Sequence, residues 1–310
     1  MIKLNKESLF IAGKGFCMGM ADIVPGVSGG TVALITGVYD QLISSISSVN
    51  KEFLTHIIKF RIKAAAEHIN LSFLLPLFMG ILTAIISMAS LMHFLMSNYG
   101  VYTWSLFFGL ILASIVFIAK HIETIKDWKS FAYIAFGTCV GYFIVTLIPV
   151  ETPNNTIFVF LSATIAICAM ILPGISGSFI LLILGKYIYV TSAIKAPFEG
   201  SNLMVIATFG SGCLVGLLSF SKLLNYLLKH YHNQLMCVLV GFMIGSMKKI
   251  WPWREVLEQK VVRGKTHVLK DAVIFPQSFG TEEIIAFGLM FFGIILVFAI
   301  ESLTNKDSKK

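Results

Sequence analysis

The sequence predicts an all-α integral membrane protein with an internal repeat, and three observations support this prediction. The 310 residues are 56% hydrophobic and only 13% charged, whereas soluble domains carry about 25% charged residues. Several mainly apolar stretches are roughly 17 to 27 residues long, enough to cross about 30 Å of hydrocarbon as a helix. A Pro-Gly-x-Ser-Gly motif occurs twice, at residues 25–29 and 173–177. A protein with one water-soluble core is therefore excluded.

The apolar stretches predict three membrane-spanning helices in each half of the chain. The halves are residues 1–150 and 151–310, and each begins with one apolar element that the motif interrupts, at 9–48 and 157–194. The predicted spans are 71–97, 101–119 and 131–149 in the first half, and 203–228, 234–248 and 282–300 in the second.

The repeat extends beyond the two motifs, which read PGVSGG and PGISGS at an offset of 148 residues. The same offset pairs Gly37 with Gly185 and Tyr39 with Tyr187. An offset of 132 residues gives three further pairs: Gly80 with Gly212, Gly109 with Gly241, and Ser114 with Ser246. Self-similarity over this length predicts a duplicated fold.

Each motif is expected to break its apolar element. Proline removes a backbone donor and clashes with the preceding turn, and glycine favours non-helical backbone. A broken backbone inside hydrocarbon is tolerated only where protein or a polar cavity satisfies it. Two forms fit: a discontinuous spanning helix, which makes the halves parallel, or a re-entrant hairpin, which makes them inverted. The Lys and Arg content of the loops does not decide between them.

The residues after each proline are suited to an anion. Ser28 can cap a helix that begins with free N–H groups and the positive end of a helix dipole, and Ser176 occupies the matching position. The alternative is that these residues only make tight turns between helices. The candidate binding residues in the motifs are Pro25, Gly26, Ser28, Gly29, Gly30, Thr31, Pro173, Gly174, Ser176, Gly177 and Ser178.

Three charged residues in the apolar segments are functional candidates, because an ionised group in a span is costly. Asp22 lies three residues before Pro25 and has Met170 as its repeat counterpart. It is a candidate proton carrier, or a partner for Lys14 or a substrate, and otherwise a capping or interfacial carboxylate at the helix break. Lys186 and Lys222 could balance the charge of a bound anion, or could instead extend to the membrane surface.

Other classes of site are not indicated. The sequence holds no HExxH, P-loop or G-x-S-x-G motif and no evident cluster of carboxylates or histidines, so no enzyme, metal or cofactor is expected. All five cysteines lie in apolar segments without CxxC spacing. The net charge of +8 comes largely from short loops such as 51–63 and 248–270, which suits contact with anionic lipid heads better than nucleic acid.

The string ADIVPGVSGGT at residues 21–31, the string LPGISGS at 172–178 and the G-K-Y that follows at 185–187 resemble a known bacterial membrane family. That family is associated with polyprenyl-phosphate translocation. The resemblance implies a multi-pass protein of the bacterial cytoplasmic membrane that returns undecaprenyl phosphate to the cytoplasmic leaflet, where it serves again as carrier lipid for envelope polymers. Ser178 stands where the first motif has Gly30, so the two half-sites need not be equivalent.

The resemblance also favours inverted halves with re-entrant elements. It implies a cytoplasmic N-terminus, C-terminus and 51–68 segment, and an external 248–280 loop. The protein would give the phosphate head a polar path while the tail stays among membrane lipids, and co-transported protons could offset the charge carried inward. The alternatives are a secondary transporter of a small soluble anion, and a scaffold whose two motifs pack together without transport. Nothing in the sequence specifies an oligomeric state.

Overall fold

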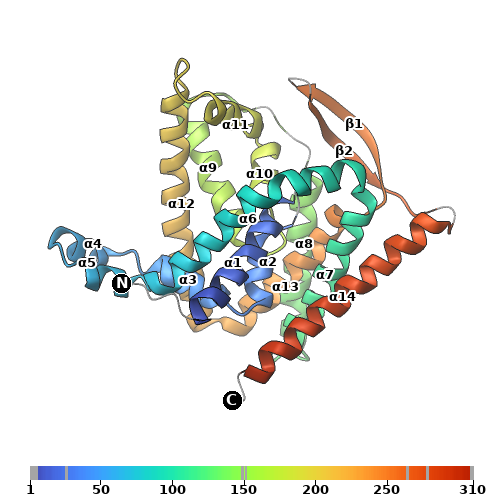
Figure 1. Ribbon diagram of the computed structural model, residues 1–310, viewed down its shortest axis with the longest axis horizontal. Helices are drawn as coiled ribbons and strands as arrows, with labels where there is room; N and C mark the ends of the chain where they lie inside the picture. Colours follow the sequence, from blue (N-terminus) through green and yellow to red (C-terminus); the bar gives the residue numbers. More distant parts are fainter. Residues whose placement is uncertain are drawn as a thin grey trace. The chain divides into compact units, whose positions relative to one another are not determined.

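A computed structural model describes residues 6–24, 27–147, 150, 152–262, 265–276 and 279–307, and most of them are helical (Figure 1). The first half contributes α1 (Lys6–Ile23), α2 (Gly29–Ile35), α3 (Tyr39–Ser47), α4 (Lys51–Ile58), α5 (Ile62–His68), α6 (Leu71–Asn98), α7 (Gly100–Lys120) and α8 (Trp128–Thr146). The second half contributes α9 (Thr156–Ile171), α10 (Gly177–Ile183), α11 (Tyr187–Lys195), α12 (Asn202–His230), α13 (His232–Ile250), β1 (Arg254–Val262), β2 (Lys265–Val273) and α14 (Thr281–Asp307).

The chain forms two compact units, and each unit draws on both halves of the sequence. Unit 1 consists of Met1–Ala89 and Glu151–Leu235, and unit 2 consists of Ser90–Val150 and Met236–Lys310. Each half therefore gives its broken element to unit 1. The first half is divided within α6, and the second half is divided near the start of α13, so that all of α12 belongs to unit 1.

Unit 1 contains two segments with the same order of short helices, α1 to α3 and α9 to α11. In each segment a second turn follows the motif, at Gly37 (φ +68°) and Gly185 (φ +66°). A left-handed residue that ends a helix is usually glycine, because glycine has no Cβ to clash. The matching backbone bonds run from Val38 N–H to Ala33 O at 2.9 Å and from Lys186 N–H to Leu181 O at 2.8 Å. The axes of α10 and α11 are bent by 111° at this turn.

Glycines let the helices of unit 1 approach closely. A Cβ at Gly80 of α6 would collide with the backbone of α1 at Ala12, and one at Gly212 of α12 would collide with the backbone of α9 at Phe160. These two glycines are partners at the 132-residue offset. Each broken element is thus held against the long helix that follows it by a glycine at the same repeat position.

Unit 2 pairs helices from different halves: α7 packs on α14, and α8 packs on α13. On α8 and α13, glycines four residues apart face each other, and a Cβ at any of them would meet the backbone of the other helix. This small-xxx-small pattern is typical of helices that associate within a membrane. The glycines are Gly137 and Gly141 on α8, and Gly241 and Gly245 on α13.

In the described part of the chain, five helices are long and apolar enough to cross a membrane: α6, α7, α8, α12 and residues 281–299 of α14. The bent pair of α10 and α11 would make a sixth if it counts as one span. The predicted span 234–248 corresponds to α13, which is not among these five; polar residues at both its ends, His232 to Gln234 and Lys248 to Lys249, shorten its apolar part. Many large apolar side chains on these helices are exposed, for example Phe78, Leu82, Ile86, Phe131, Phe136, Phe143, Phe291 and Phe292.

An antiparallel hairpin of β1 and β2 interrupts the otherwise helical chain, and the sequence analysis did not predict it. The two strands lie in a basic segment that was treated only as a loop. They contain several valines, which favour strands because their branched side chains fit a pleated surface. Trp251 fixes the base of the hairpin by donating its indole N–H to Ile274 O at 2.9 Å, and Trp253 packs on Ala286 and Met290 of α14.

Replacing Gly241 by leucine should destabilise the protein by roughly 1 to 3 kcal/mol or more, because the side chain would overlap the backbone of α8. Gly288 on α14 is a matched control, since a Cβ there meets no atom within 4 Å. Thermal unfolding of both variants in one detergent provides the measurement. Equal loss of stability in Gly241→Leu and Gly288→Leu would contradict the packing described for α8 and α13.

Candidate functional site

The first motif positions Ser28 at the start of α2, within unit 1. Ser28 has extended backbone (φ −122°, ψ 133°), and its Oγ accepts a hydrogen bond from Gly30 N–H at 3.1 Å. This is the expected N-cap arrangement, in which a hydroxyl satisfies one of the free N–H groups at a helix start. Pro25 and Gly26 lie outside the described residues. The predicted cap at Ser28 is therefore present.

Ser28 also connects the first motif to the second. Its hydroxyl lies 3.3 Å from both Met170 O and Leu172 O, at the end of α9, and can donate to either carbonyl. The last carbonyls of a helix have no partner within the helix, so an outside donor stabilises them. The side chain is buried, with 1% of its surface exposed. One serine thus begins α2 and closes α9.

Thr31 and Gly174 form a second connection between the motifs. Gly174 N–H donates to Thr31 Oγ1 at 3.1 Å in a buried setting. Gly174 has a φ of +82°, a conformation that glycine adopts without strain. A Cβ at Gly30 would lie 2.7 Å from Ile171 O, so the backbones meet closely there. The two motifs interlock through backbone groups as well as side chains.

Asp22 supplies a negative charge at the start of α2. Its Oδ1 accepts a hydrogen bond from Gly29 N–H at 2.7 Å, across the break between α1 and α2. A carboxylate at a helix N-terminus is favoured by the free N–H groups and the helix dipole. An N–H predicted to bind an external anion is thus already bonded to an anionic side chain of the protein.

The second motif repeats this arrangement without the charge. A Cβ at Gly29 would meet the Asp22 carboxylate, and a Cβ at Gly177 would lie 3.0 Å from Cβ of Met170. The sequence repeat pairs Asp22 with Met170, and the structure positions both against the first residue of the next helix. Only the first half carries an ionisable group at this position.

The serine of the second motif does not repeat the cap made by Ser28. Ser176 makes no side-chain bond to the start of α10. Its Oγ instead lies 2.8 Å from Oγ of Ser178, the residue that replaces Gly30 of the first motif. The expectation that Ser176 caps its helix as Ser28 does was therefore wrong, because the extra hydroxyl provides a nearer partner.

Lys14 has a role that the sequence analysis did not assign. Its Nζ donates to Thr36 O, at the end of α2, at 2.7 Å. Lys14 and Asp22 lie eight residues apart on α1, and they contact the two opposite ends of α2. The cation at the C-terminus and the carboxylate at the N-terminus both complement the dipole of α2. Lys14 and Asp22, which were expected to pair with each other, instead each bond to one end of α2.

The other two lysine candidates lie apart from the contacts between the motifs. Lys186 is buried at the turn between α10 and α11, where its Nζ donates to Thr152 O at 2.6 Å and to Asn154 Oδ1 at 2.7 Å. Both partners are neutral, so the charge of Lys186 is solvated by them but not neutralised. Lys222 is exposed on α12. The structure therefore brings Asp22, rather than either lysine, to the motifs.

Most of the chain matches a known protein family. Residues 18–268, which include both motifs, match the family described as VCA0040-like, undecaprenyl phosphate translocase-like. The chain belongs to this family. Together with its apolar helices, membership makes the chain a multi-pass membrane protein. No solved structure matches the chain.

Two relatives of this translocase-like family cover most of the chain. A polyprenyl-phosphate transporter of Vibrio cholerae serotype O1 is 40% identical over 300 residues, which is 94% of this chain and 96% of the relative. A polyprenyl-phosphate transporter of Staphylococcus aureus is 31% identical over 256 residues, covering 77% of this chain and 84% of the relative.

Replacing Thr31 by valine should lower the free energy of unfolding by about 1 to 3 kcal/mol, because Gly174 N–H would stay buried without its acceptor. Thr83→Val is a suitable control, since Thr83 is exposed and its hydroxyl donates to Met79 O of its own helix. Thermal unfolding of both variants in detergent measures the difference. Similar stability of the two variants would contradict the role given to the contact between Thr31 and Gly174.

Proposed function

We propose that this protein moves undecaprenyl phosphate from the outer to the inner leaflet of the bacterial cytoplasmic membrane, so that the carrier lipid can be used again in envelope synthesis. The observation that carries the proposal is the similarity, over 94% of the chain, to a polyprenyl-phosphate transporter. The anionic side chain bonded at the start of α2 supports it independently, because it marks a position suited to negative charge. The function proposed is transport and not catalysis.

The phosphate head is proposed to bind where the two motifs meet. The start of α2 offers Gly29 N–H and Gly30 N–H, with Ser28 beside them and Thr31 one residue further. A phosphomonoester carries about 1.5 to 2 negative charges near neutral pH and accepts several hydrogen bonds. Pro25, Gly26, Pro173, Gly174 and the second-motif residues Ser176, Gly177 and Ser178 remain proposed members of the same site.

Binding of the phosphate at this position requires Asp22 to release Gly29 N–H. An ionised Asp22 and a phosphate dianion would repel each other and compete for the same donor. A protonated Asp22 has no net charge and would release the donor at lower cost. Proton uptake and phosphate binding therefore favour each other, and the coupling is carried by the first half, because Met170 holds the equivalent position in the second.

Proton uptake would also help the direction of transport. Moving one negative charge inward against an inside-negative potential costs about 2.3 kcal/mol per 100 mV. A proton that travels with the phosphate removes part of this cost. Lys186 is a buried cation with neutral partners. It is proposed to lower the free-energy cost of moving the charged phosphate through the protein, and Lys222 is the other basic candidate.

The proposed architecture is a pair of inverted halves, 1–150 and 151–310, whose broken elements re-enter the membrane. Several paired features support a duplication: the matching turns at Gly37 and Gly185, the matching close contacts at Gly80 and Gly212, and the pairing of helices from different halves in unit 2. In an inverted arrangement the helix starts at the two motifs would face a common position near the middle of the membrane.

One observation favours a second candidate, a non-transporting scaffold. The two motifs contact each other through Ser28 and Leu172 and through Thr31 and Gly174, as a scaffold would require. The same contacts are also expected of a transporter whose site closes when Asp22 occupies it. A transport measurement distinguishes the two candidates.

Vesicles containing the purified protein and labelled undecaprenyl phosphate provide this measurement. The wild type should move the lipid inward, and a pH gradient should accelerate the movement. In Asp22→Asn the acceleration of lipid movement by the pH gradient should be about tenfold smaller than in the wild type, because asparagine cannot take up the proton. Asp127→Asn is the control, since Asp127 is exposed and makes no side-chain bond at the start of α8.

Each outcome of this assay has a distinct reading. No lipid movement by the wild type would favour the scaffold, and movement of free phosphate instead of the lipid would favour a transporter of small soluble anions. Full gradient-driven movement by Asp22→Asn would contradict the coupling role and make its carboxylate structural.

The inverted architecture predicts opposite sides for two exposed positions of unit 1. A cysteine at Lys63, between α4 and α6, should react from the cytoplasmic side, and one at Glu199, between α11 and α12, from the outside. Each new cysteine should be introduced into a variant that lacks the five natural cysteines, because two of these, Cys17 and Cys139, are exposed and could also react. Labelling of intact cells with a membrane-impermeant maleimide tests this. Reaction of both positions from the same side would contradict inverted halves.

A further inference from the structure

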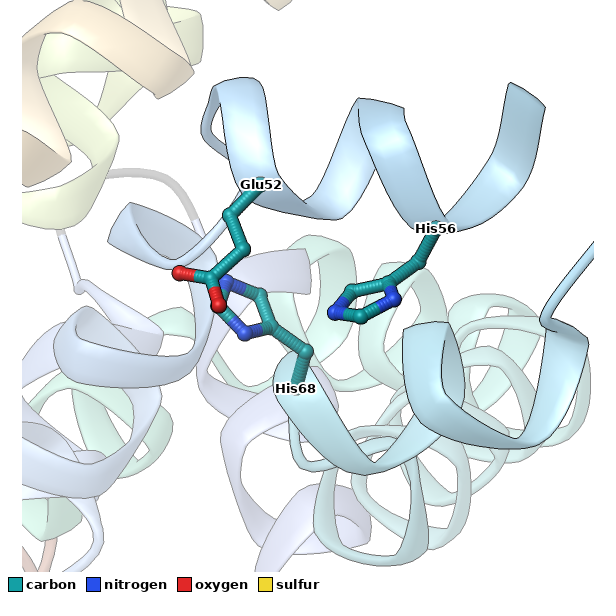
Figure 2. Close-up of side chains that lie close together, drawn as sticks. All are labelled: Glu52, His56 and His68. Atoms are coloured by element: carbon teal, nitrogen blue, oxygen red, sulfur yellow. The ribbon is translucent and has the colours of Figure 1, made fainter. Parts of the chain in front are cut away.

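Three side chains with metal-binding atoms lie together in unit 1, away from the two motifs. They are Glu52 and His56 on α4 and His68 on α5, and Figure 2 shows them between the two short helices. The ligand atoms of the three side chains all lie within 4.8 Å of one another. No spacing in the sequence indicates this group, because His68 is twelve residues beyond His56 and only the turn between the helices brings the two side chains together.

The turn that forms this group is specific. The two helices are joined by Lys59, Phe60 and Arg61, and Phe60 has a φ of +51°, which reverses the chain sharply. Arg61 N–H donates to His56 O at 2.8 Å across the turn. Glu52 and His56 are four residues apart and so lie on one face of α4. That face is turned toward His68 in Figure 2.

We propose that Glu52, His56 and His68 bind a divalent transition-metal ion, with Zn²⁺ as the ion best suited to them. Two imidazoles and one carboxylate, with a further position for water, form a ligand set that zinc commonly takes in proteins. Imidazole nitrogen also selects first-row transition metals over Mg²⁺ or Ca²⁺, which prefer oxygen ligands. Glu52 is exposed and His56 and His68 are half-buried, so the ion can enter from solvent and small side-chain rotations can shorten the distances.

Two further observations on the histidines support a metal site. His68 Nε2 lies 3.2 Å from Asn50 Oδ1, an oxygen that also accepts from Glu52 N–H and Phe53 N–H at the start of α4. Since that oxygen can only accept, His68 donates Nε2–H to it and keeps a lone pair on Nδ1. A ligating histidine is usually oriented in this way by an acceptor at its other nitrogen.

The second observation concerns His56. Among the described residues, its Nδ1 is buried and has no hydrogen-bond partner. A buried ring nitrogen without a partner is costly, and an ion or a water molecule is one explanation for it. The two imidazole rings lie 5.9 Å apart between centroids and are tilted by 55°, so they approach each other without stacking face to face.

The proposed ion would hold α4 and α5 together as one hairpin. Neither helix is long enough to be stable alone in water, and the only ion pair on α5 among the described residues is the exposed contact of Lys63 with Glu67 at 4.0 Å. The hairpin exposes apolar side chains, as segments at a membrane surface do. They are Leu54, Ile57, Ile58, Phe60 and Ile62.

The test uses the full-length protein in detergent, purified with a tag that contains no histidine. The wild type should bind about one Zn²⁺ per chain, and Co²⁺ as a spectroscopic probe should give the visible absorption of a four-coordinate ion. His56→Gln and His68→Gln should each weaken binding at least tenfold. His121→Gln and His230→Gln are matched controls, because each of those rings bonds to a carbonyl of its own helix.

A second measurement needs no variant. Zn²⁺ should slow tryptic cleavage of the wild type after Lys59, Arg61 and Lys63, because the ion holds the hairpin closed. Equal binding by the wild type and by both His56→Gln and His68→Gln would overturn the proposal, as would the absence of Zn²⁺ binding to the wild type. Loss of binding in those two variants with unchanged elution volume and thermal stability would support it.

Discussion

The hydrogen bond from Gly29 N–H to Asp22 is the interaction on which the account of this protein depends. It joins α1 to α2 across the broken segment at 2.7 Å, and it puts a carboxylate at a helix start. Lys14 on the same face of α1 contacts the other end of α2. A seven-residue helix has little stability of its own, so α2 is held in place by the charges that α1 presents to its two ends. A phosphate bound at the proposed site would have to replace one of those charges.

Close backbone contact between helices is the second constraint on this fold. Apolar side chains gain little by leaving lipid for another helix, so packing within a membrane depends on close approach of the backbones. Gly80 and Gly212 provide it at equivalent positions in the two halves of unit 1. In unit 2 the helices instead exchange partners between halves, with Gly241 of α13 against α8. Unit 2 is therefore held together by close contacts between segments from the two halves of the sequence.

Much of this could be predicted from residues whose physics is local. Pro25, Pro173 and the adjacent glycines predicted the broken elements. Apolar length predicted six spans, and five of them correspond to helices that are long and apolar enough to cross a membrane. The hairpin of β1 and β2 was not predicted, because its nine-residue strands lie in a basic segment that was treated only as a loop. The contacts of Ser28 with Met170 and Leu172 and of His68 with Asn50 join residues distant in sequence. No spacing rule contains such contacts, since they depend on how the helices pack. The departure of Ser176 from Ser28 followed from one substitution, Ser178 for glycine.

The most direct test of the central claim is to locate the bound lipid head. A polyprenyl phosphate with a photoreactive group in the isoprene unit next to the phosphate can be crosslinked to the protein in vesicles, and the modified peptides identified by mass spectrometry. The account predicts crosslinks within residues 22–31 and 170–178 that an excess of unlabelled lipid abolishes. Competable crosslinks confined to other segments would contradict the claim that the two motifs bind the phosphate.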